Sequence, residues 1–210
     1  MKLIYVADPM CSWCYGFGKE MTALTERHPD LALEIITGGL RNGGQEKLDD
    51  AGKRFRLKHW ARVEAASGLA FNREGFLARQ GFVYNTEPIC RAFVAARTIA
   101  PEVDLLALFR QLQRGFYVDA LDTTDGQVLS QMGAAALSRL GHPCDAEAFF
   151  KVWNSAEVIA LAQADFSRAR GMGVQSFPAL FLEREGRLLP IGAGYASVDL
   201  LDQSLQELMG

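Results

Sequence analysis

The sequence has few cysteines and histidines and no long apolar run, and each shortage excludes a class of protein. Only four cysteines and three histidines occur among 210 residues, of which 49% are apolar. A chain of this size and composition can bury a proper core without disulfide cross-links. No window approaches the roughly 20 consecutive apolar residues of a membrane-spanning helix. We identify no cluster of basic residues, and the net charge is −3, so binding of nucleic acid and electrostatic attachment to a membrane are not expected.

Motifs for metal binding are also missing. A zinc site beginning with one CxxC needs about two further ligands at a recognisable spacing. The sequence contains no second CxxC and no HxxxH, and the other cysteines and the histidines are scattered at Cys90, Cys144, His28, His59 and His142. We therefore predict no metal site and no organic cofactor.

The N-terminal segment indicates the compartment. Residues 1–10 contain one lysine followed by an apolar stretch that is too short for a signal peptide. We expect a cytoplasmic protein, where thiols are mostly kept reduced. In that setting a closely spaced cysteine pair is more often catalytic or metal-binding than a structural bridge.

The beginning of the chain predicts a β-α-β unit. Lys2–Ala7 is apolar and contains β-favouring residues, and Asp8-Pro9 interrupts it. A helix is expected from the cysteines to about His28, followed by a strand over Leu31–Thr37. Two strands joined by a helix are expected to lie parallel in one sheet.

Helices dominate the middle of the chain, from about Gly44 to Gly171. Apolar residues recur at helical spacing over Leu105–Phe116 and Val128–Leu140. Lys47–Arg62 reads as a polar helix, and Gly68–Gly81 has no clear pattern. Asp145 is expected to cap the next helix.

The end of the chain returns to strands. Ala179–Glu183 and Arg187–Gly192 are predicted to form a hairpin. Ser197 is expected to cap a final helix. The order is therefore β-α-β, a helical block, then β-β-α.

One motif with redox chemistry is present, Cys11-Ser12-Trp13-Cys14. It follows a strand and begins a helix, where free backbone N–H groups and the helix dipole stabilise a thiolate. The second cysteine lies one turn further along and is more sheltered. We predict that Cys11 is the nucleophile and Cys14 the resolving thiol of disulfide exchange.

A second motif, Phe177-Pro178, directly precedes the strand Ala179–Glu183. A cis bond here would set a tight turn beside the cysteines and leave the backbone before the ring free to pair with an extended substrate. We predict a cis bond and assign Phe177, Pro178 and Trp13 to substrate binding. Trp13 either offers an aromatic platform or packs the helix, and both remain open.

Together these features resemble the DsbA family of thioredoxin-fold oxidoreductases. The stretches DPMCSWCYGF, NTEPICRAFVAAR and GVQSFPALFL are most similar to its FrnE-like branch of candidate protein-disulfide isomerases. The resemblance implies an α/β thioredoxin-like fold (residues 1–43 and 172–210) with a large inserted helical domain (residues 44–171). It also implies an enzyme that exchanges thiols and disulfides with protein or small-molecule substrates, for which glutathione can serve as co-substrate.

Two positions depart from the family pattern. The DsbA dipeptide contains a histidine that stabilises the reduced thiolate, whereas Ser12-Trp13 has none. The residue before the proline is Phe177, which is bulkier than the threonine or valine common in the fold. A reductase or isomerase fits these residues better than a strong oxidase.

Other interpretations remain open. Kappa-type glutathione transferases and 2-hydroxychromene-2-carboxylate isomerases share the superfamily, but they lack the paired cysteines and use a serine near the start of the chain. A redox-sensing or chaperone-like binding module is the third alternative. Asp8 is expected to accept a hydrogen bond at the helix start. Cys90 is interpreted as a small core residue and Cys144 as a tolerated surface thiol.

Overall fold

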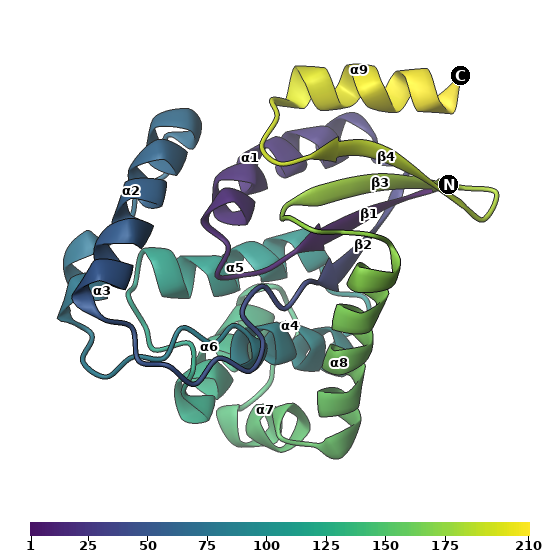
Figure 1. Ribbon diagram of the computed structural model, residues 1–210. Helices are drawn as coiled ribbons and strands as arrows, with labels where there is room; N and C mark the ends of the chain where they lie inside the picture. The colour runs from purple at the N-terminus through teal and green to yellow at the C-terminus, as the bar shows by residue number, and fades with distance from the viewer.

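A four-stranded mixed sheet lies at the centre of the fold, which the computed structural model describes over residues 1–210 (Figure 1). The strands are β1 (Lys2–Ala7), β2 (Ala32–Thr37), β3 (Ala179–Arg184) and β4 (Arg187–Ala193). Their order is β2-β1-β3-β4; β1 and β2 run parallel, and β3 is antiparallel to both β1 and β4. This arrangement confirms the predicted thioredoxin-like fold.

Nine helices accompany the sheet. Helix α1 (Ser12–Arg27) joins β1 to β2, and α9 (Val198–Met209) ends the chain. Seven helices lie between β2 and β3: α2 (Asp50–Ser67), α3 (Arg73–Ala78), α4 (Glu87–Ile99), α5 (Leu105–Tyr117), α6 (Gly126–Arg139), α7 (Ala146–Trp153) and α8 (Ala156–Gly171). In Figure 1 α4 to α8 lie below the sheet, whereas α2 stands beside α1. The predicted domain boundaries at 43/44 and 171/172 stay a prediction.

Side chains of β1 alternate between the two faces of the sheet, as strand geometry requires. Leu3 and Tyr5 belong to the main core, which continues into the helical block. The Tyr5 ring lies 5.9 Å from the rings of Phe17 in α1 and Phe109 in α5. Ile4 and Val6 face the opposite side and pack with α8. Helices therefore cover both faces of β1, which is fully buried from residue 3 onward.

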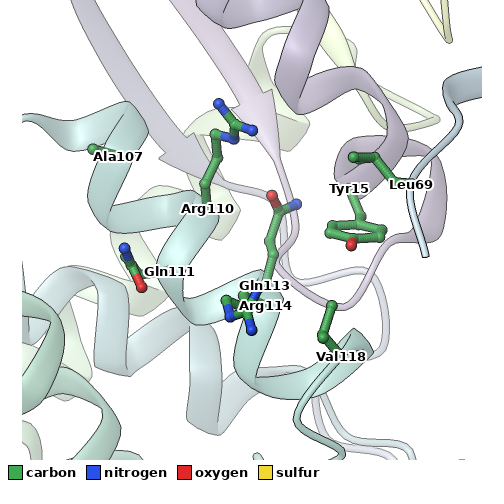
Figure 2. A pocket seen from close by; sticks show the side chains of 8 residues that line it. All are labelled: Tyr15, Leu69, Ala107, Arg110, Gln111, Gln113, Arg114 and Val118. Carbon is green, nitrogen blue, oxygen red and sulfur yellow. The ribbon is translucent and has the colours of Figure 1, made fainter. Parts of the chain in front are cut away.

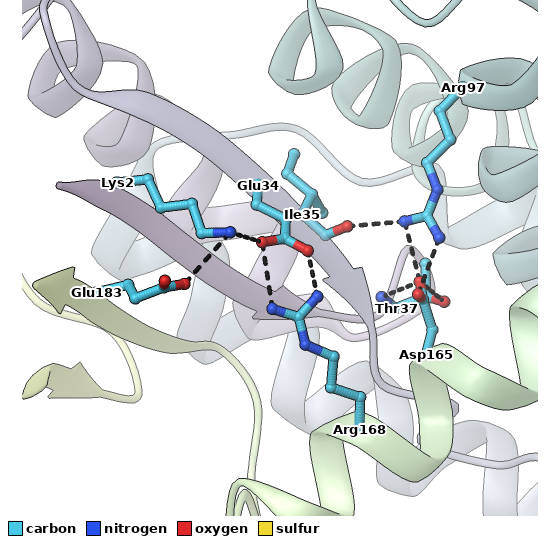
Figure 3. A network of polar contacts seen from close by, with 8 residues as sticks. All are labelled: Lys2, Glu34, Ile35, Thr37, Arg97, Asp165, Arg168 and Glu183. Carbon is cyan, nitrogen blue, oxygen red and sulfur yellow. Dashed lines mark hydrogen bonds and ion pairs between the residues drawn. The ribbon is translucent and has the colours of Figure 1, made fainter. Parts of the chain in front are cut away.

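A polar network joins α8 and α4 to the sheet (Figure 3). Asp165 of α8 accepts from both Arg97 of α4, at 2.8 Å, and the backbone N–H and hydroxyl of Thr37, at 3.0 Å. Glu34 of β2 pairs with Arg168 and Lys2, whose hydrogen bonds lower the pKa of Glu34 to about 2. The network fixes the helical block against β2.

Capping of the helices is predictable in part. Asp145 caps α7 as predicted, accepting from the Ala148 N–H at 2.7 Å. The prediction that the Ser197 side chain caps the last helix is wrong. Ser197 occupies the N-cap position of α9, but its side chain makes no capping bond. Instead the Val198 N–H donates to the Glu20 carboxylate of α1 at 2.8 Å, because the packing of α9 on α1 brings a charged acceptor to that end.

Candidate functional site

The turn between β1 and α1 is held by a fully buried carboxylate, Asp8. Its Oδ1 accepts from the Met10 N–H at 2.8 Å and its Oδ2 from the Leu40 N–H at 2.7 Å. Burial raises the pKa of this carboxyl. The predicted hydrogen bond at the helix start is present, and the same side chain also ties down the segment after β2.

The two cysteines of the CxxC motif differ in accessibility. Both thiols are free. The relative solvent exposure is 8% for Cys11 and 0% for Cys14. Cys11 occupies the N-cap position of α1, but its side chain makes no capping bond. Its thiol donates instead to the Phe177 carbonyl, with 3.6 Å between Sγ and O. Burial, followed by a hydrogen bond with Cys11, raises the pKa of the Cys14 thiol well above its usual value.

The loop before β3 contacts the cysteine pair from the far end of the chain. The Phe177–Pro178 bond is cis, as predicted. The Pro178 carbonyl accepts from the Gly194 N–H at 2.8 Å, which anchors the loop to the end of β4. The Phe177 ring packs so closely on Gly38 that a Cβ at position 38 would lie 2.1 Å from it. The loop is thus held by residues that follow the two edge strands of the sheet, Gly38 after β2 and Gly194 after β4.

A cleft of about 340 Å³ opens between the start of α1, helix α2 and residues 175–177. Three of the predicted site residues, Cys11, Trp13 and Phe177, line it. The Trp13 ring also lies 5.8 Å from the ring of Tyr195, so this side chain both packs against the core and forms part of the cleft wall. Phe55 contributes an exposed apolar side chain to the same wall.

Basic residues gather at this cleft, contrary to the sequence-based conclusion that no basic cluster exists. Arg41, Arg56 and His59 line it, and no acidic residue does. The guanidinium of Arg62 lies 5.9 Å from the Trp13 ring centroid. A signal was present in the run KRFRLKHWAR (residues 53–62), which contains five lysines and arginines. The low net charge of the whole chain concealed this local excess.

The two remaining cysteines lie outside the cleft. Cys90 is fully buried in α4, as expected for a core residue, and its thiol lies 3.6 Å from Asp8 Oδ2. Burial raises the pKa of the Cys90 thiol well above its ordinary value. Cys144 is partly exposed before α7 and lies 3.4 Å from the Asp145 carbonyl. Neither cysteine forms a disulfide.

A second cavity, of about 330 Å³, lies between α1 and α5 (Figure 2). In Figure 2 the side chains of Arg110 and Gln113 extend upward from α5, and Tyr15 stands to their right. Arg110 donates to the Thr22 hydroxyl at 2.7 Å, and the Gln113 amide is buried without a partner. None of the predicted site residues lines this cavity.

No group of three or more His, Cys, Asp or Glu side chains is arranged to hold a metal ion. No helix combines the length and the apolar character that crossing a membrane requires.

Known structures resemble the whole chain, although no protein-family model and no curated protein matches the sequence. A candidate protein disulfide isomerase from Nitrosomonas europaea is 32% identical, with a TM-score of 0.87 over 100% of this chain and 98% of that one. The cytosolic disulfide reductase DsbM from Pseudomonas aeruginosa, also solved with glutathione, is 24% identical, with a TM-score of 0.76 over 100% and 99%. A 2-hydroxychromene-2-carboxylate isomerase is 16% identical, with a TM-score of 0.66 over 100% and 95%. The last two likenesses establish the fold alone.

Proposed function

This chain belongs to the DsbA-like family of thioredoxin-fold oxidoreductases, and we propose that it is a thiol–disulfide oxidoreductase whose redox pair is Cys11 and Cys14. One observation carries the proposal. Cys11, slightly exposed at a helix N-terminus, has its Sγ 3.6 Å from the Phe177 carbonyl, whereas Cys14 is fully buried.

The exchange proceeds in two displacements. The Cys11 thiolate attacks one sulfur of a substrate disulfide, forms a mixed disulfide and releases the first substrate thiolate, which takes up a proton. Cys14 then loses its proton and attacks Cys11 Sγ, forming the Cys11–Cys14 disulfide and releasing the second thiol. Two cysteine thiols are oxidised and one substrate disulfide is reduced. A dithiol, or two molecules of a monothiol such as glutathione, restores the pair.

The difference in burial between the two cysteines supports the proposed order of attack. Because burial raises the pKa of the Cys14 thiol, this cysteine stays protonated until a mixed disulfide forms beside it. Trp13 and Phe177 are proposed substrate contacts because they line the cleft beside Cys11. Pro178 is proposed because its cis bond follows the Phe177 carbonyl, which accepts from the Cys11 thiol. The steps require no metal or organic cofactor.

We also propose that the enzyme works as a reductase or isomerase in the cytoplasm. The dipeptide Ser12-Trp13 lacks the histidine that favours a strongly oxidising couple. DsbM, which shares the fold, is a cytosolic disulfide reductase. The equilibrium potential of the Cys11–Cys14 pair against glutathione measures this direction directly.

Replacement of each cysteine tests the assignment. Cys11→Ser is expected to lower insulin reduction by dithiothreitol to the uncatalysed rate. Cys14→Ser is expected to accumulate a mixed disulfide at Cys11, detectable by mass spectrometry, because the resolving thiol is gone. Cys144→Ser serves as the matched control and should retain full activity. Undiminished activity of Cys11→Ser would remove this residue from the mechanism.

The fold shared with the isomerase supports a second candidate, a glutathione-dependent transferase or isomerase. Tight glutathione binding, with turnover of an electrophile that survives Cys14→Ala, would favour it over disulfide exchange. Client binding that is unaffected by replacing both cysteines would instead favour a binding module.

A further inference from the structure

The positive charges of Arg41 and Arg56 at the cleft have no acidic partners within the molecule. None of the ion pairs in the structure includes Arg41 or Arg56. Other arginines of the chain do pair, such as Arg73 with Glu64 on the same α2–α3 unit. In a protein of net charge −3, an uncompensated basic wall beside one cleft indicates a site for an anion.

Arg56 is held in place without neutralising its charge. Its guanidinium carbon lies 4.1 Å from the centroid of the Tyr84 ring, and one nitrogen donates to the Gly52 carbonyl at 3.1 Å. The Tyr84 hydroxyl in turn donates to the Met10 carbonyl at 2.5 Å, one residue before Cys11. A guanidinium has five N–H donors, so most of those of Arg56 remain available to a ligand close to the nucleophile.

Neighbouring charges reinforce this interpretation. Burial, together with the positive charge of Arg41, lowers the pKa of Arg56. Two cations that share one cleft repel each other, and a bound carboxylate relieves both the repulsion and the loss of hydration. Trp13, Leu40 and Phe55 supply apolar surface for the carbon chain that would connect a carboxylate to a sulfur.

We infer that the cleft selects small disulfides and thiols that carry carboxylates, and that Arg41 and Arg56 are the residues that determine this specificity. The inference rests on the proposed function, because it places the substrate sulfur at Cys11. The cleft volume of about 340 Å³ favours a small molecule, since it lies at the lower end of the about 300–1,000 Å³ typical of such sites.

A charge series of small disulfides tests the inference. The substrates are 3,3′-dithiodipropionate with two carboxylates, 2-hydroxyethyl disulfide with no charge, and cystamine with two ammonium groups. For the double variant R41Q/R56Q, kcat/KM for the anionic disulfide is expected to fall about tenfold, because charge-assisted hydrogen bonds are lost. The neutral substrate should change by less than about twofold, and cystamine should be unchanged or faster.

The variant and the unaltered enzyme are compared on the same substrate, which removes differences in intrinsic reactivity between the three disulfides. Arg54→Gln is the matched control: it removes one positive charge from an exposed position of α2 that does not line the cleft. Added salt should reduce the preference of the unaltered enzyme for the anionic substrate. Equal losses on all three substrates would overturn the inference, because the arginines would then act on the Cys11 thiolate or on folding. No loss on any substrate would overturn it as well.

Failure of the proposed function can be recognised separately. If neither insulin nor any of the three disulfides is reduced in a Cys11-dependent manner, disulfide exchange is the wrong activity. Calorimetric binding of 3,3′-dithiodipropionate and cystamine to C11S/C14S then decides the charge preference alone. Preferential binding of the anion, abolished by R41Q/R56Q, supports the anionic site, and equal binding of the two compounds contradicts it.

Discussion

At the level of single residues, the position of Phe177 depends on the absence of a side chain at Gly38. A Cβ at position 38 would lie 2.1 Å from one ring carbon of Phe177 and 2.2 Å from another. Non-bonded carbon atoms cannot approach so closely. The Phe177 ring is rigid and packed against the core, so it cannot move aside as the end of a flexible side chain would. The close approach therefore fixes the residue whose carbonyl accepts from Cys11.

Gly38→Ala should displace the Phe177 ring and with it the loop that contacts Cys11. We expect kcat/KM for disulfide reduction to fall about tenfold, since small misplacements of reacting groups have large effects. Overpacking should also lower the free energy of unfolding by about 1–3 kcal/mol. Gly171→Ala is the control, because a Cβ there meets no atom within 4 Å. Equal activities of the two variants would show that the position of the ring does not matter.

The residues of the site differ in how far sequence could predict them. Cys11, Cys14 and Pro178 belong to short motifs whose chemistry is local, so residue type and spacing are sufficient to predict that they lie at one place in the fold. Arg56 and Tyr84 have no such motif. They come together at the cleft only when α2 lies beside the start of α1. Contacts between aromatic side chains far apart in the chain support that placement, since Tyr15 of α1 packs on Phe71, which stacks on Trp60 of α2.

At the level of elements, the N-terminus of a helix can be capped by its own N-cap residue or by a side chain from another helix. Asp145 caps α7 with its own side chain, whereas Ser197 leaves that task to Glu20 of another helix. The residue type at the N-cap position therefore does not determine how much it contributes.

Asp145→Ala should lower the free energy of unfolding by about 1 kcal/mol, the usual effect of losing a capping side chain. Ser197→Ala should lower it by less than about half of that amount, since no capping bond is lost. Urea unfolding followed by circular dichroism measures both. Similar losses for the two variants would contradict the assignment of the cap at α9 to Glu20.

Long helices with a regular apolar pattern can be predicted from the sequence, whereas the shortest helix cannot. The periodicity of α5 and α6 reflects one buried stripe each, so both helices could be expected from sequence. Helix α3 has only six residues and one fully buried position, Phe76, too few to establish a period. Its capping residue, Asn72, accepts from the Gly75 N–H at 2.8 Å and was the only local signal available.

At the level of the whole molecule, Asp165 joins three segments that are remote in sequence. Its carboxylate receives two bonds from Arg97 and two from Thr37 (Figure 3). Arg97 also donates to the Ile35 carbonyl at 2.9 Å. The fold class could be predicted from the two ends of the chain. The orientation of the helical block could not, because it depends on pairs such as Arg97 and Asp165.

Asp165→Ala should lower the free energy of unfolding by about 3–5 kcal/mol, because the largely buried Arg97 loses its counter-charge. Glu147→Ala removes an exposed ion pair with Lys151 on α7 and should change stability by less than about 1 kcal/mol. Urea unfolding of both variants checks the difference. Equal effects would mean that the Arg97–Asp165 pair does not hold the helical block to the sheet.

The contact between Cys11 and Phe177 joins positions that are 166 residues apart, and this separation has a consequence during synthesis. The ribosome releases both thiols on the order of 10 s before the loop that contacts them has been made. Throughout that interval the nascent chain carries an uncovered cysteine pair that is open to oxidants and to other thiols. Completion of translation, rather than formation of the first strand and helix, is therefore the event that produces a working enzyme.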